Sequence, residues 1–214
     1  MKTPLAPDLP LELQRLEPEP PDLRGFELSE RAVTRSDWSD RDATGLRLRE
    51  CRLDGVQLDG AGLRRAELRD VEIDGGSWAN ANAVESVLRR VRFGNARLTG
   101  AVFANATFDD VVFEDCRLDL TSFRFAKLAR VRFERCRLDE ADLYEARFDG
   151  AVFSSCSLAS ASLAGATFVD TELRGCDLTA VGNPEQLRGV RMRWADVIES
   201  AGVLAEALGI QVAE

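Results

Sequence analysis

The chain has 214 residues, of which 45% are hydrophobic, a net charge of −9 and no histidine. Histidine is the commonest general base and metal ligand, so its absence argues against hydrolytic and metal chemistry. The acidic balance disfavours direct binding to nucleic acid, whose backbone is itself negative. No apolar run approaches the roughly 18 residues of a membrane-spanning helix, so we expect neither nucleic acid nor membrane as a partner.

Residues 1–21 form a proline-rich tail. This tail holds six of the seven prolines and lacks the apolar stretch of a secretory signal, so we expect a cytoplasmic protein. Terminal segments without packing partners are commonly disordered. We therefore expect Met1–Pro10 to be mobile, and Leu9–Leu16 either to hold the first coils of the following domain or to leave them frayed.

Residues 22–182 repeat with a period of five. From Leu23 to Leu178, every fifth position is Leu or Phe apart from Val33, Trp38, Ala43, Ile73, Trp78 and Ala83. The residue two places earlier is small in every unit from Cys51 to Cys176. A helix repeats about every 3.6 residues and a strand every two, so neither explains this period. Each unit instead predicts a short extended segment and a corner, with the large and the small residue pointing inward.

Four such units would close one square coil, and the equivalent residues of successive coils would then stack. Two columns of this kind are Phe93, Phe113, Phe133 and Phe153, and Cys116, Cys136, Cys156 and Cys176. Trp38 and Trp78 lie two coils apart, and each is followed one unit later by an alanine, which leaves room for the indole. No proline occurs between positions 22 and 183, as expected where stacked coils pair through backbone N–H groups. The pattern predicts a stacked solenoid.

The repeated units, for example Ala141-Asp142-Leu143-Tyr144-Glu145, resemble the pentapeptide-repeat family, whose consensus is A(D/N)LXX. The resemblance covers about three quarters of the chain. It implies an all-β fold, a right-handed quadrilateral β-helix of about eight coils, with a C-terminal α-helical cap. The repeats serve as architecture in many settings, so the resemblance is specific for the fold and much less so for a partner.

Residues 183–214 break the period and predict this cap. Asn183 and Pro184 are typical of a helix start. A second helix is expected over Trp194–Leu208, with Asp196 as its N-cap and Gly209 at its end, followed by a short strand at Ile210 and Val212. The segment plugs the open end of the solenoid in one interpretation. In the other interpretation, the segment also forms a homodimer, as its resemblance to the gyrase-directed members of the family implies. The residues assigned to the cap or dimer contact are Trp194, Val197, Ile198, Ala201, Leu204 and Leu208.

Charge is unevenly spread over the four predicted faces. The Trp38 face, which also contains Leu58, Trp78 and Leu118, has a net charge of −4, whereas the others have 0 or −1. Its acidic residues are Asp37, Asp40, Asp59, Asp119, Asp139, Glu140 and Asp177, and its basic residues are Arg97, Arg117 and Arg137. Three apolar residues at outward positions, Leu120, Phe125 and Tyr144, are expected to converge at the next corner. These acidic and apolar residues, Asp177 excepted, are the predicted docking site.

No residue pattern predicts catalysis. The five cysteines fall at inward positions and are interpreted as packing residues, with no CxxC pair and no histidine partner. The carboxylates lie beside arginines at outward positions, and pairs such as Arg137 and Asp139 are expected to form surface ladders. We expect no cofactor, no metal site and no enzymatic activity.

Two functions remain open. The resemblance to gyrase-directed family members implies a DNA-mimicking rod that binds DNA gyrase or another type II topoisomerase and lessens the action of gyrase poisons. The alternative is a general protein-interaction scaffold with an unidentified partner. The rod alone has a net charge of only −5, and plasmid-borne quinolone-resistance members have loops that this chain lacks, so both hypotheses are kept.

Overall fold

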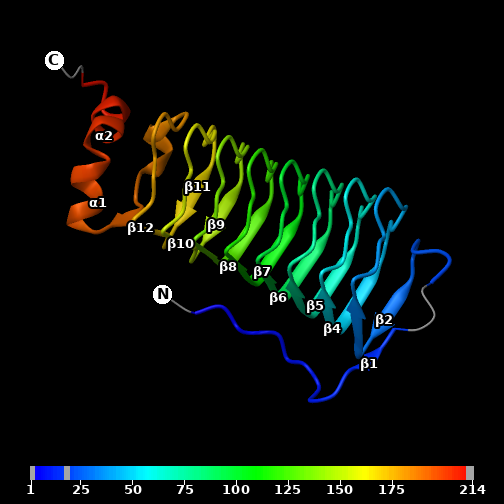
Figure 1. Ribbon diagram of the computed structural model, residues 1–214. Helices are drawn as coiled ribbons and strands as arrows, with labels where there is room; N and C mark the ends of the chain where they lie inside the picture. The colour runs from blue at the N-terminus through cyan, green and yellow to red at the C-terminus, as the bar shows by residue number, and fades with distance from the viewer. Residues whose placement is uncertain (1–2, 17–19, 211–214) are drawn as a thin grey trace.

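The repeat region forms a rod of stacked coils with parallel strands (Figure 1). The computed structural model describes residues 3–16 and 20–210. One face, here called the Phe133 face, carries in spatial order β1 (Gln14–Arg15), β3 (Arg31–Thr34), β4 (Arg47–Asp54), β5 (Glu67–Asp74), β6 (Val87–Gly94), β7 (Thr107–Glu114), β8 (Lys127–Glu134), β10 (Val152–Ser154), β12 (Glu172–Arg174) and β13 (Arg191–Met192). Strands β2 (Glu27–Ser29), β9 (Arg147–Asp149) and β11 (Thr167–Val169) belong to the adjacent face, around which β4–β8 also bend.

The register of the strands confirms that four units close one coil. Leu48 pairs with Leu68, and Phe113 pairs with Phe133. The two remaining faces are joined by isolated parallel bridges with the same spacing, such as Arg117 to Arg137. The predicted all-β quadrilateral fold is therefore confirmed, with the short strands β1 and β13 added at the two ends of the stack.

The fifth residue of each unit forms the corner. Corner residues such as Asp70, Leu120 and Phe125 have φ values of 55°, 58° and 57°. L-residues adopt this left-handed region at a cost that glycine does not bear. The turn is held by stacking, because a corner N–H donates to a carbonyl of the next coil, as Leu120 N does to Asp139 O at 2.9 Å.

The interior is filled by the predicted inward residues. The rings of Phe93, Phe113, Phe133 and Phe153 stack with centroid separations of 4.9, 5.0 and 4.7 Å. Trp38 and Ala43 are both fully buried, as the spacing predicts. All five cysteines are buried and free. The thiol of Cys136 donates to Phe113 O at 3.4 Å, and burial raises the pKa of Cys51, in keeping with a packing role.

The C-terminal segment differs from the prediction of one continuous helix. It contains a short 3-10 helix, η1 (Pro184–Leu187), and two α-helices, α1 (Trp194–Glu199) and α2 (Ala201–Ala207). The helix breaks at Ser200, a buried residue with φ −95° and ψ 12°. The predicted strand at Ile210 and Val212 extends outside the described residues.

The expected caps are also corrected. Asp196 lies within the first turn of α1, and Arg193 occupies the N-cap position. Asp196 is buried and accepts hydrogen bonds from Arg193 Nε at 3.0 Å and Nη2 at 3.2 Å. Asn183 precedes η1 with φ 60° and makes no side-chain capping bond. The Asp196 carboxylate is therefore held by Arg193 of the same segment and does not cap the helix.

Mobility was expected for Met1–Pro10, of which the structure describes residues 3–10. Within residues 3–16 the N-terminal segment runs back along the outside of the rod from the β1 end (Figure 1). Leu5 N donates to Asp110 Oδ1 at 3.2 Å, and Asp8 N donates to Asp70 Oδ1 at 3.1 Å. Strand β1 then pairs with β3, so Leu9–Leu16 does hold the first coils.

Candidate partner-binding surface

The acids of the Trp38 face are not equally available to a partner. Asp37, Asp40, Glu140 and Asp177 are exposed, Asp59 and Asp139 are half-buried, and Asp119 is buried. Hydrogen bonds from the hydroxyl and the backbone amide of Ser39 hold the pKa of Asp37 below its usual value. Asp59 accepts a hydrogen bond from Ala79 N at 2.8 Å. The predicted acidic residues therefore divide into an exposed set and a set that is engaged within the rod.

The middle of this face is a shallow depression of mixed charge. Its lining residues are Arg97, Thr99, Arg117, Asp119, Leu120, Arg137, Asp139 and Glu140. Arg137 Nε lies 2.5 Å from Asp119 Oδ1 and 3.4 Å from Asp139 Oδ2. The shorter contact joins one residue on each of two neighbouring coils. The expected ladder of arginine–carboxylate pairs therefore forms mainly between neighbouring coils. Arg97, Arg117 and Arg137 form a row beside the acids in the middle of this face.

The predicted apolar corner is split between two sites. Phe125 and Tyr144 are in contact edge to face, with ring centroids 5.4 Å apart. Arg124 lies over the Tyr144 ring at 4.3 Å and donates to Asp142 Oδ2 at 2.8 Å. Leu120 occupies the preceding corner and lines the depression described above.

Sequence reasoning missed Arg124 and Asp142 as parts of this cluster. Their separation along the chain is the same as that of Asp119 and Arg137, and both pairs join neighbouring coils. A search for oppositely charged residues at that separation would have identified both pairs.

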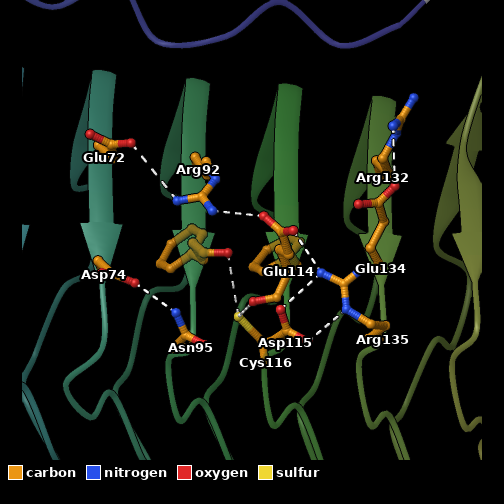
Figure 2. Close-up of polar contacts among 12 residues, drawn as sticks. Glu72, Asp74, Arg92, Asn95, Glu114, Asp115, Cys116, Arg132, Glu134 and Arg135 are labelled. Carbon is orange, nitrogen blue, oxygen red and sulfur yellow. Dashed lines mark hydrogen bonds and ion pairs between the residues drawn. The ribbon is translucent and has the colours of Figure 1, made fainter.

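The Phe133 face carries a continuous polar network across β5–β8 (Figure 2). Arg92 lies between Glu72, at 3.8 Å, and Glu114, at 2.7 Å. Arg135 joins Glu114, at 2.6 Å, to Asp115, at 2.8 Å. The same four coils hold five carboxylates and three arginines on this face, namely Glu72, Asp74, Glu114, Asp115, Glu134, Arg92, Arg132 and Arg135.

This network changes where the negative charge of the central rod lies. Over coils β5–β8 the Phe133 face has an excess of two acids, whereas the central Trp38 face has three acids and three arginines. The hydrogen bonds from Arg92 and Arg135 hold the pKa of Glu114 below its usual value, so the carboxylate stays ionised. Counting charge over whole columns missed this because three of the four exposed acids of the Trp38 face, Asp37, Asp40 and Asp177, lie near its ends.

A metal centre and a membrane-spanning helix are two further kinds of site that bear on function. Within residues 3–16 and 20–210, no group of three or more potential metal ligands comes together. In that same part of the chain, no helix has the length and apolarity needed to cross a bilayer.

Two family models match the repeat region. A model for a pentapeptide repeat region matches residues 86–150, and a model for nine copies of pentapeptide repeats matches residues 133–177. Each lies inside the four-sided coils in which the five-residue phase never slips. This repeat region belongs to the pentapeptide-repeat family. No curated protein matches this pentapeptide-repeat protein in sequence.

A solved structure of QnrB1 shows the same fold. A trypsin-treated variant of QnrB1, a plasmid-mediated fluoroquinolone resistance protein, has a TM-score of 0.58 and 21% identity, covering 89% of this chain and 92% of that chain. HetL, a pentapeptide repeat protein involved in heterocyst differentiation regulation from the cyanobacterium Nostoc, has a TM-score of 0.36 and 20% identity, covering 80% and 92% of the two chains. At such identities the likeness to QnrB1 establishes the architecture and nothing about a partner.

Proposed function

We propose that this pentapeptide-repeat protein is a non-catalytic rod that mimics DNA and binds DNA gyrase or a related type II topoisomerase. The observation that carries the proposal is an uninterrupted, acidic solenoid with the fold of QnrB1, whose name ties it to fluoroquinolone resistance. A protein surface that accepts DNA is electropositive and attracts a negative rod. Gyrase is a cytoplasmic enzyme, so the proposal also places the protein in the cytoplasm.

A DNA-gyrase supercoiling assay tests the proposal. Purified protein is titrated with and without a fluoroquinolone, and saturating inhibition at sub-micromolar protein is expected, with less drug-stabilised cleavage. The variant Asp37→Asn, Asp40→Asn, Glu140→Gln neutralises exposed acids of the Trp38 face and should weaken inhibition by about tenfold. Gyrase that is indifferent to tens of micromolar protein would contradict gyrase binding.

A matched control separates position from total charge. The variant Glu30→Gln, Asp54→Asn, Asp149→Asn removes three exposed acids from other faces of the rod. It changes the net charge by the same amount, so it should retain inhibition within about threefold of the wild type. Equal losses in both variants would mean that gyrase senses net charge and not the Trp38 face.

A general protein-interaction scaffold is the second candidate. The arginine row beside Asp119 and Asp139, and the exposed Phe125 with its half-buried neighbour Tyr144, favour a partner with mixed charge and apolar groups. Aromatic residues at exposed sites are frequent anchors of protein interfaces. Under this hypothesis Phe125→Ala abolishes capture of the partner while gyrase remains unaffected.

We also propose that two copies associate through their C-terminal helices. Trp194 and Ile198 lie one turn apart on α1 and are 76% and 60% exposed, and Leu208 is 78% exposed. Large exposed apolar side chains in one region commonly mark an interface. Three other residues were predicted to form this contact. Ala201 is exposed, but its side chain is small, and Val197 and Leu204 are half-buried.

Light scattering after gel filtration tests the dimer. We expect twice the chain mass of 23.6 kDa for the wild type and a monomer for the double variant Trp194→Glu, Ile198→Glu. Leu120→Glu is the control, since Leu120 is 56% exposed but lies on the rod. A monomeric wild type at every concentration would rule out this association.

A further inference from the structure

The N-terminal segment lies against one corner of the rod, between the Phe133 face and the adjacent face. This corner is a column of alternating charge formed by Asp70, Arg90, Asp110 and Arg130, one from each of four successive coils. Arg90 Nη2 lies 2.5 Å from Asp70 Oδ2, and Arg130 Nε lies 2.8 Å from Asp110 Oδ1. The two carboxylates also accept the backbone N–H groups of Asp8 and Leu5.

A corner that the described part of the N-terminal segment does not contact shows how far the segment buries the carboxylates of its own corner. Asp115 has the same position in its unit as Asp110 and is paired in the same way with the equivalent arginine of the following coil, Arg135. The Asp115 side chain is 44% exposed, whereas those of Asp70 and Asp110 are 6% and 8% exposed. Pairing with arginine therefore does not bury a corner carboxylate, and the N-terminal segment accounts for the difference.

The prolines of the segment recur every third residue. Pro4, Pro7 and Pro10 are partly buried. Leu5 and Asp8, which donate the hydrogen bonds, each follow one of these prolines directly. Pro4 and Pro7 are thus partly buried, and the residue that follows each of them supplies a donor to the rod.

The spacing of the prolines matches the spacing of the acids. Asp70 and Asp110 lie on β5 and β7, which are two strand spacings apart, or about 9.6 Å. Three residues of extended, polyproline-type chain span about 9.3 Å. A chain with proline at every third residue can therefore meet one acid of the column per turn without strain. It runs in the direction opposite to the coils, since Leu5 lies at Asp110 and Asp8 at Asp70.

We propose that this corner is a recognition site for extended chains with proline at every third residue, that the N-terminal segment is its resident ligand, and that a separate peptide of the same chemistry binds there. Specificity comes from two sources. Asp70 and Asp110 accept main-chain N–H groups two coils apart, and the prolines are partly buried along the same segment. Polyproline-type segments lose little conformational freedom on binding, which favours such recognition.

The test uses a chain that lacks residues 1–12 and a labelled synthetic peptide of those residues, with anisotropy as the readout. Saturable binding is expected with a Kd of about 1 mM or tighter, the range in which a tethered segment remains docked. Replacing Asp8 with proline in the peptide keeps the extended conformation but removes one donor, so affinity should fall about tenfold. The rod variant Asp70→Asn, Asp110→Asn should lose binding by at least as much.

Asp115→Asn is the matched control and should bind the peptide like the parent rod. In the full chain, the amide protons of Leu5 and Asp8 should exchange slowly, and Asp70→Asn should speed exchange at Asp8 while Asp115→Asn should not. The proposal is overturned if millimolar peptide shows no saturable binding. It is equally overturned if the Asp8→Pro peptide binds as tightly as the natural one.

Discussion

Phe133→Ala should destabilise the protein by about 3–5 kcal/mol. Phe133 is buried in the middle of the phenylalanine column, stacked on Phe113 at 5.0 Å and on Phe153 at 4.7 Å, and it also meets the edge of Phe123 at 6.3 Å. Its removal leaves a cavity that the backbone hydrogen bonds of neighbouring coils prevent from closing. Because each coil contacts only its neighbours, the rod loses cooperativity at that point. Guanidinium unfolding followed by circular dichroism measures the loss.

Two further variants test whether the loss of stability in Phe133→Ala comes from the cavity in the core. Phe133→Leu should recover most of the stability, because leucine fills the same position in many other units. Arg147→Ala removes an exposed side chain and should cost well under about 1 kcal/mol. A Phe133→Ala protein within about 1 kcal/mol of the wild type would contradict the assignment of this column to the core.

The interior of the fold could be predicted because one physical requirement repeats in every unit. A large apolar residue such as Leu138 or Phe153 must point into the core. Once one such position is assigned, the period of five assigns the inward positions of all other units. The closure of a coil after four units could also be predicted, because phenylalanines such as Phe133 recur every 20 residues and aromatic rings stack favourably on one another. The coil register confirms both inferences.

Surface features were less predictable because several arrangements satisfy the same pattern. An arginine such as Arg137 can pair within its own unit or across coils, and its length lets it reach Asp119 on the neighbouring coil. The break at Ser200 depends on how the cap meets the last coils. The N-terminal segment was expected to be mobile, since a pattern of prolines does not reveal the matching acids until the coils are stacked.

Gly76→Ala should cost at least about 3 kcal/mol, although it replaces one small residue with another. Gly76 holds the inward small position of its unit, where alanine is common elsewhere, but its φ is +78°. A Cβ added there would lie 2.2 Å from Val56 O and 2.9 Å from Val56 N, both backbone atoms of the preceding coil. Alanine would therefore combine an unfavourable left-handed conformation with a clash that side-chain rotation cannot relieve.

The adjacent glycine provides the control for this substitution. Gly75 also has a left-handed φ, +65°, but an added Cβ would meet nothing within 4 Å. Gly75→Ala should cost only about 1–2 kcal/mol, and Gly75→Asn less, because Asn95 occupies the equivalent corner of the next coil with φ 54°. Urea unfolding of the three variants separates the two effects. Equal losses for Gly75→Ala and Gly76→Ala would show that conformation alone, and not the close approach of two coils at Val56, requires glycine here.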